Sequence, residues 1–239
     1  MKTFGKGRLK QKEKVMEQYV VRLYRGLGTS LAKRLVGTKI MPNHITVIGF
    51  ILVAIASFFF ATGEYAKLIV GAFILFFSFV LDFTDGTLAR LRNQTSILGD
   101  WLDAMSDDIR EVLVTLTLCI GLYKNTGATS VWLLGFVSLA ADRLIFRTTN
   151  KLYKILPYDE SEINKQVRDV FSGGIIFRII KEFLSVRLIK YTLLPVFIIF
   201  DEVFAYMVFA ALYGTLLCIA FFAFSFFKIK KEEKGNRKK

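Results

Sequence analysis

The sequence predicts an all-α polytopic membrane protein: six transmembrane helices, preceded by an amphipathic helix at the membrane interface. Apolar residues make up 54% of the 239 positions, enough for about six spans of roughly 20 residues each. The 33 Lys and Arg residues outnumber the 20 Asp and Glu, and they gather in a few segments, as on the cytoplasmic surface of a membrane protein. This composition excludes a soluble domain. It also excludes a nucleic-acid-binding protein, which would not carry 24 Phe.

The six predicted spans follow from the apolar runs of the sequence. They cover residues 45–62, 66–83, 102–122, 128–146, 188–200 and 203–227. Of the 33 Lys and Arg residues, 11 precede the first span, 2 lie between the second and third, 10 lie in 143–190, and 7 lie in the tail. Six spans place all of these segments on one side, which the positive-inside rule identifies as the cytoplasm. We therefore expect a multi-pass protein of the cell membrane with both termini in the cytoplasm.

Three parts are expected along the chain. Residues 1–44 form a basic cytoplasmic segment, residues 45–227 the six-helix domain with a cytoplasmic loop at about 148–187, and residues 228–239 a basic tail. Within the first part, apolar residues recur at steps of three and four, which predicts a helix lying on the membrane. They are Met16, Val20, Tyr24, Leu27, Leu31 and Leu35. Gly26 and Gly28 leave open whether this is one helix or two, and a simple membrane anchor is as good an interpretation as a part in chemistry.

The most informative stretch begins where the second predicted span ends. Asp82 and Asp85 are three residues apart, and Asp103 and Asp107 are four apart. Each pair therefore lies on one face of its helix. Two helices joined by a loop would present four carboxylates to a shared point.

Such a cluster needs compensating charge. A carboxylate inside a membrane helix costs on the order of 3 kcal/mol, and like charges repel one another. Two divalent cations would neutralise the cluster, and Asp oxygens suit Mg²⁺ or Mn²⁺ better than zinc. A pair of such ions is typical of phosphoryl transfer, because it holds both the attacking and the leaving oxygen.

Small and basic residues around the aspartates fit the same interpretation. Gly86, Ala89 and Gly99 would let a nucleotide approach the backbone closely, and Arg90 offers a fork of donors to phosphate. Taken singly, the glycines could serve helix packing, and Arg90 could be a positive-inside residue. Together with the aspartates they indicate a nucleotide site.

The segment 82–107 resembles the D-x-x-D-G-x-x-A-R-x8-G-x3-D-x3-D signature of the CDP-alcohol phosphotransferase family, with every fixed position present. The resemblance extends to the six-span layout, the amphipathic N-terminal helix and the segment Pro42-Asn43-x-Ile45-Thr46 at the start of the first span. It implies an integral-membrane enzyme of phospholipid biosynthesis, in which an acceptor alcohol attacks the phosphorus of a CDP-alcohol and CMP leaves. A divalent metal, a lipid as at least one substrate and a homodimer are implied with it.

The resemblance also implies roles for single residues. Asp82, Asp85 and Asp103 would be metal ligands, and Asp107 would be the general base and a ligand of a second ion. Gly86, Ala89, Arg90 and Gly99, with Asp82 and Asp85, would line the CDP site. From the residues alone, Asp107 lies furthest from the loop among the four, where an acceptor hydroxyl could reach it.

Further charged residues have no fixed role in the signature. Asp100 and Asp108 fall about 100° from the ligand face, so we expect them to be solvated or paired. Arg110 and Glu111 are expected to pair with each other or with the cluster, or to touch a substrate. Arg143 and Arg147 are candidates for binding an anionic group of a substrate, with membrane anchoring as the alternative. His44, the sole histidine, is interpreted as a neighbour of a helix cap rather than as a base.

The substrates are left open by the sequence. The segments around Asp82 and Asp103 resemble the branch of the family that uses inositol phosphate, whereas the N-terminal helix resembles that of the aminoalcohol enzymes. The pair Gly86-Thr87 differs from the Gly-Lys of many choline and ethanolamine enzymes. Two other functions remain as alternatives: a divalent-cation transporter using the same aspartates, and a catalytically silent protein that binds nucleotide or lipid.

Overall fold

The computed structural model describes residues 19–155 and 186–236, and within these residues it is entirely helical. Residues 1–18, most of the predicted cytoplasmic loop and residues 237–239 lie outside the described part. The described helices are α2 (Tyr19–Leu35), α3 (Pro42–Phe60), α4 (Tyr65–Leu91), α5 (Ile97–Thr126), α6 (Ser130–Ile155), α9 (Val186–Ile199) and α10 (Val203–Asn236). The all-α prediction is confirmed for this part of the chain.

A helix occupies the position of each of the six predicted spans. Three of the described helices, α3, α4 and the segment Val203–Phe227 of α10, are long and apolar enough to cross a membrane, and Lys190–Ile199 forms a shorter apolar helix. α5 and α6 carry several charged side chains, which lowers their mean hydropathy. That all six helices cross the membrane stays a prediction.

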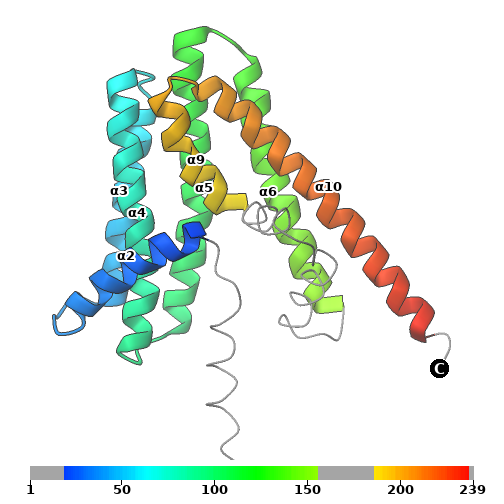
Figure 1. Ribbon diagram of the computed structural model, residues 1–239, viewed down its shortest axis with the longest axis horizontal. Coiled ribbons are helices and arrows are strands. Elements are labelled where there is room, and N and C mark those ends of the chain that lie inside the picture. Colours follow the sequence, from blue (N-terminus) through cyan, green and yellow to red (C-terminus); the bar gives the residue numbers. More distant parts are fainter. Residues whose placement is uncertain (1–18, 156–185, 237–239) are drawn as a thin grey trace, which may run out of the picture.

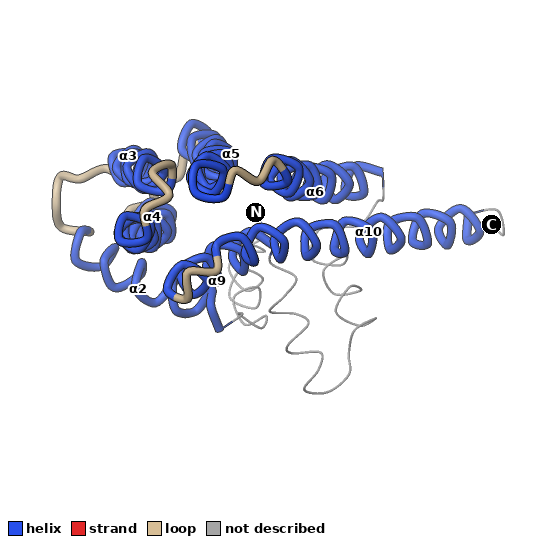
Figure 2. The backbone as a smooth tube through the Cα atoms, turned by 90° about the horizontal axis from the view of Figure 1, so that it is seen from above, coloured by secondary structure: helices blue, strands red, loops and turns tan. Residues whose placement is uncertain are grey.

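The helices form two packed groups. α3 packs against both α4 and α5, and α2 crosses the lower part of α4; α6 and α10 pack together and diverge from the first group toward their lower ends (Figure 1). α9 contacts both α4 and α10 and joins the groups. Seen from above, α3, α5 and α6 follow one another along one side, with α9 and α10 on the other (Figure 2). A single large apolar core draws residues from α2, α3, α4, α5, α9 and α10.

Local sequence features explain where the helices near the aspartates begin and end. α3 starts with Pro42 in its first turn, where the missing N–H of proline has no cost. His44 caps this start, because its Nδ1 accepts the backbone N–H of Met41 at 3.4 Å. α5 starts after Ser96, whose Oγ accepts the N–H of Gly99 at 3.0 Å. α5 ends at Gly127, which adopts the left-handed conformation that favours glycine.

The helix predicted before the first span is present over Tyr19–Leu35, and its glycines do not interrupt it. The residues that it buries against the bundle are Tyr24, Gly28 and Ala32, whereas Leu27 of the predicted apolar stripe is 41% exposed. Gly28 explains why this face of α2, rather than the face with Leu27, lies against the bundle. A Cβ at this position would lie 2.8 Å from the Cβ of Phe83, so only glycine lets α2 approach α4 this closely. The contact is next to Asp82 in the sequence.

Replacing Gly28 by Ala should therefore separate α2 from α4. We expect Gly28→Ala to lower the free energy of unfolding by about 1–3 kcal/mol, the usual cost of overpacking. A Cβ added at Gly26, half a turn away, would have no atom within 4 Å, and Gly26→Ala should be neutral or stabilising by up to about 1 kcal/mol. Thermal unfolding of the two purified variants in detergent measures this difference. Equal melting temperatures would contradict the close packing of α2 on α4.

Candidate active site

The four predicted aspartates lie on two helices that share α3 as a neighbour. Asp82 and Asp85 lie near the end of α4, and Asp103 and Asp107 lie in the first turns of α5. Because α3 packs against both helices, its first turn closes one side of the space between them. The charges of Asp82 and Asp103 both act on Asp85, so three of the four carboxylates are within electrostatic range of one another.

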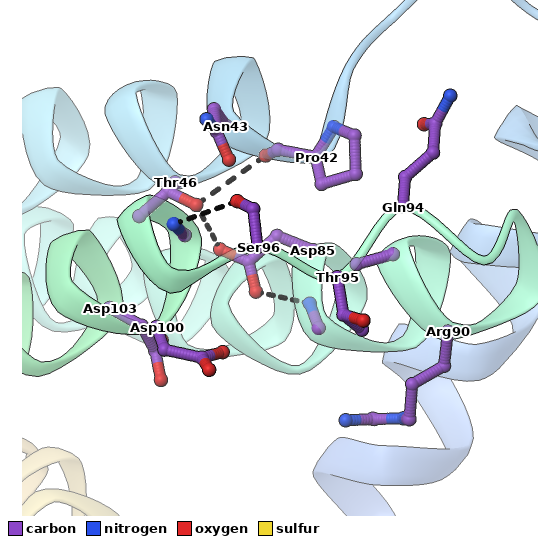
Figure 3. A pocket seen from close by; sticks show the side chains of 13 residues that line it. Pro42, Asn43, Thr46, Asp85, Arg90, Gln94, Thr95, Ser96, Asp100 and Asp103 are labelled. Carbon is purple, nitrogen blue, oxygen red and sulfur yellow. Dashed lines mark hydrogen bonds between the residues drawn. The ribbon is translucent and has the colours of Figure 1, made fainter.

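A pocket of about 130 Å³ opens between these helices. Asp85 and Asp103 both line it, with Arg90 on one side and Asp100 and Asp103 on the other (Figure 3). All four residues predicted for the nucleotide site, Gly86, Ala89, Arg90 and Gly99, line the same pocket. The remaining lining residues come from the start of α3 and from the turn before α5: Pro42, Asn43, Thr46, Gln94, Thr95 and Ser96.

Asp85 is the most buried of the four aspartates, at 3% exposed. Its Oδ2 accepts a hydrogen bond from the hydroxyl of Thr46, and its Oδ1 accepts one from the backbone N–H of Gly86. These bonds offset part of the cost of burying a carboxylate. The bond from Thr46 also joins α4 to the start of α3.

Asp82 and Asp107 share a different partner. The guanidinium of Arg110 donates from Nη2 to Oδ1 of Asp82 at 2.8 Å and from Nη1 to Oδ1 of Asp107 at 2.7 Å. Arg110 is 2% exposed, and its Cζ lies 4.6 Å from the ring centroid of Phe79. The pairing expected for Arg110 within the cluster is therefore present.

The donor set suits a hard divalent cation, although three of its four carboxylates already have protein partners. Four carboxylates on two neighbouring helices are the ligands that Mg²⁺ and Mn²⁺ prefer. In the part of the chain described, no group of three or more His, Cys, Asp or Glu has its side chains gathered closely enough to hold a metal ion. Thr46 and Arg110 instead satisfy three of the four carboxylates. The residues present thus fit a metal by their chemistry, and binding it requires these side chains to rearrange.

Comparisons with known proteins agree with the signature. The family model named CDP-alcohol phosphatidyltransferase matches residues 39–219, about three quarters of the chain. The chain belongs to the CDP-alcohol phosphatidyltransferase family.

Two named proteins are similar to this family member. It is 28% identical over 113 residues to the archaetidylinositol phosphate synthase of Pyrococcus horikoshii, an alignment that covers 47% of this chain and 58% of that protein. It is similar in fold to the phosphatidylinositol phosphate synthase of Mycobacterium tuberculosis. The structure with CDP-DAG bound superposes with a TM-score of 0.60 and 21% identity, over 83% of this chain and 92% of that one. The structure in complex with manganese and citrate superposes with a TM-score of 0.59 and 22% identity, over 83% of this chain and 88% of that one.

The remaining charged residues of this family member divide between pairs and exposed positions. Asp108 pairs with Arg143 at 2.7 Å, and Arg143 also lies 3.9 Å from Glu111. Asp100 and Arg147 are exposed. Among the residues described, Arg110, Arg143 and Arg147 lie outside the lining of the pocket, so their role toward a substrate stays a prediction.

Two residues next to the pocket were not recognised from their spacing. Thr46 was interpreted as part of a helix start, yet its hydroxyl binds Asp85. Arg92 follows the arginine of the signature by two residues and donates to the backbone carbonyls of Leu35, Val36, Thr38 and Ile40 at 2.5–3.1 Å. It thereby fixes the connection between α2 and α3 that leads into the pocket wall. The sequence held a signal for Thr46, because the segment Pro42–Thr46 was already part of the resemblance to the family.

Replacing Arg92 should loosen this connection. Charge-assisted hydrogen bonds contribute about 1.5–3 kcal/mol each when well formed, and the partial exposure of Arg92 reduces the expected total for Arg92→Ala to about 2 kcal/mol. Arg90→Ala is the matched control: Arg90 is exposed and donates to Thr87 at 3.2 Å within its own helix, so its loss should barely change stability. Thermal unfolding without nucleotide compares the two variants. The same small loss in both would show that the carbonyl contacts of Arg92 do not hold the segment.

Proposed function

We propose that this protein is an integral-membrane CDP-alcohol phosphotransferase of phospholipid biosynthesis. The reaction transfers a substituted phosphate: the hydroxyl oxygen of an acceptor alcohol forms a bond to the phosphorus of a CDP-alcohol, the bond from that phosphorus to the CMP oxygen breaks, and the hydroxyl proton passes to a base. The observation that carries this proposal is the gathering of Asp85, Asp103 and the four predicted nucleotide-site residues around one pocket, in a chain of this family.

The residues take the following roles in the proposal. Asp82, Asp85 and Asp103 would hold the divalent ions, Mg²⁺ or Mn²⁺, with Asp107 as a further ligand. Bound ions would supply positive charge to the diphosphate and lower the pKa of the acceptor hydroxyl. Asp107 is the general base that accepts the hydroxyl proton. A manganese complex of a structural relative supports the choice of metal.

The pocket itself suits a diphosphate better than a whole nucleotide. At about 130 Å³ it is smaller than the roughly 300–1,000 Å³ of typical ligand pockets. Arg90 at its edge provides donors for phosphate oxygens. Gly99 leaves room at the start of α5, where an added Cβ would lie 3.1 Å from Oγ of Ser96. The cytidine and the alcohol portions would then extend beyond the pocket on either side.

The donor is proposed to be lipid-linked and the acceptor a phosphorylated polyol. One relative is named an archaetidylinositol phosphate synthase, and the other is a phosphatidylinositol phosphate synthase with CDP-DAG bound. The segments around Asp82 and Asp103 agree with this choice, because they resemble the branch of the family that uses inositol phosphate. Arg143 and Arg147, on α6, are the proposed partners of the acceptor's anionic group.

The surroundings of the site are also part of the proposal. We place six helices across the membrane, both termini in the cytoplasm, and a second copy of the chain beside the first. The distribution of Lys and Arg supports the orientation, and the pocket lies at the same end of the helices as Arg90 and Arg92. Family membership favours an enzyme over a cation transporter, and the intact signature favours it over a silent binding protein.

Release of CMP tests the reaction directly. Purified protein incubated with CDP-diacylglycerol or a CDP-linked archaeal lipid, inositol phosphate and Mg²⁺ or Mn²⁺ should release CMP, and a chelator should abolish the release because the diphosphate charge is then uncompensated. CMP is measured by chromatography, with other CDP-alcohols and acceptors as a panel. Metal-independent release would remove the metal from the mechanism, and no release from any pair would favour the silent protein.

Two aspartate variants should lose activity for different reasons. Asp107→Asn removes the base and should lower turnover by at least 100-fold, with much of the CDP binding retained. Asp82→Asn should weaken binding of Mn²⁺ and of CDP together. Asp201→Asn is the control: Asp201 is exposed and has a φ of 58° that Asn also adopts readily. It belongs to the turn between α9 and α10, which lies at the upper end of the helices in Figure 1. Turnover and calorimetric binding separate the three. Normal turnover by Asp107→Asn would exclude it as the base.

A further inference from the structure

A buried arginine lies between two aspartates of the signature that belong to different helices. Arg110 of α5 donates to Asp82 of α4 at 2.8 Å and to Asp107, one turn earlier on α5, at 2.7 Å. The side chains of Asp82 and Asp107 are 20% and 30% exposed, whereas that of Arg110 is 3% exposed. The charged end of Arg110 is thus on the protein side of both carboxylates.

The signature ends at Asp107, three residues before Arg110, so it does not specify this contact. The physical consequence of the contact follows from charge. Guanidinium stays protonated at any accessible pH, and charges this close interact strongly in a buried setting. Arg110 therefore stabilises Asp82 and Asp107 when no other cation is near. The same positive charge repels a divalent ion that approaches these two carboxylates, and its N–H groups occupy one oxygen of each.

We propose that Arg110 is a built-in counter-ion, which holds Asp82 and Asp107 together in the metal-free protein and weakens the binding of divalent cations by the cluster. The inference rests on the metal site of the proposed function and adds to it a residue that sets the metal affinity. Arg110 is a positioning residue in this role, since it touches the ligands rather than the reacting atoms.

The geometry favours this role over direct contact with a substrate. Both terminal nitrogens of Arg110 are already committed to carboxylates, and its guanidinium carbon lies 4.6 Å from the ring centroid of Phe79. A cation held over an aromatic ring and paired on both sides gains little by moving out. Contact with a substrate would require Arg110 to leave a site where it is 2% exposed.

The test uses Mn²⁺ alone and the full chain purified in detergent. Mn²⁺ binding is measured by electron paramagnetic resonance, and the melting temperature is measured with and without Mn²⁺. Arg110→Met removes the charge and keeps most of the side-chain volume. We expect it to bind Mn²⁺ at least tenfold more tightly than the unchanged protein. Without metal its melting temperature should be lower, and Mn²⁺ should raise it by more than in the unchanged protein.

Two further variants make the result specific. Arg110→Lys keeps the charge and loses the fork, so its Mn²⁺ affinity should stay within about threefold of that of the unchanged protein. Lys67→Met breaks an exposed ion pair, the one with Glu64 at the start of α4, and should leave Mn²⁺ affinity unchanged within the same limit. If Arg110→Met does not fold, Arg110→Gln, which also removes the charge but keeps a hydrogen-bond donor, takes its place with the same expected rise in Mn²⁺ affinity.

The outcomes separate the inference from the proposed function. Equal or weaker Mn²⁺ binding by Arg110→Met, or a tenfold loss in Arg110→Lys, would overturn the counter-ion role while leaving the metal site in place. Absence of Mn²⁺ binding by both the unchanged protein and Arg110→Met would instead overturn the metal site itself, and the inference with it. Tighter binding by Arg110→Met alone, with Lys67→Met unchanged, supports the proposal.

Discussion

The structure around the pocket is governed by the need to compensate four carboxylates held on two neighbouring helices. Each carboxylate taken out of water requires a donor or a cation, because an unpaired buried charge costs several kcal/mol. The chain meets this need from three directions. Thr46 of α3 and the N–H of Gly86 bind Asp85, and Arg110 of α5 binds Asp82 and Asp107. The compensation comes from the helices that carry the acids and from their shared neighbour, so the charges and the packing are coupled.

This coupling explains why α2 and α3 matter for a site formed by α4 and α5. α3 supplies the hydroxyl of Thr46 and packs on both neighbours. α2 lies against α4 at Gly28, beside Phe83 and Thr84, within a turn of Asp82 and Asp85. Arg92 then ties the carbonyls at the end of α2 to the end of α4. A change in the position of α2 would therefore shift the aspartates of α4 through two contacts, the packing at Gly28 and the hydrogen bonds of Arg92.

The sequence predicted the parts of this arrangement that depend on local spacing. The helix positions followed from the apolar runs, and the pairing of acids on one face followed from steps of three and four residues. Gly86, Ala89, Arg90 and Gly99 were placed together through the resemblance to a family. What could not be predicted is which distant residues meet: Thr46 binds Asp85 across 39 positions, and Arg92 reaches carbonyls 52–57 positions away. A pairing of Arg110 with the cluster was expected, but not that its partner on α4 is Asp82, 28 positions away. Two divalent ions were expected to provide the compensating charge, and spacing alone could not show that Arg110 provides part of it.

A second charged pair in the bundle differs from the aspartate cluster in a way that supports the cluster as the proposed site. Lys190 of α9 pairs with Asp142 of α6 and donates to Oγ of Ser138 at 2.8 Å. Lys190 and Asp142 are 5% and 8% exposed, and their charges balance one to one. A pair of this kind joins two helices and leaves no net charge between them. The signature instead brings four acids together with one buried arginine, and two of the acids line an open pocket. The uncompensated negative charge at that pocket is what would draw in a cation and, with it, a diphosphate.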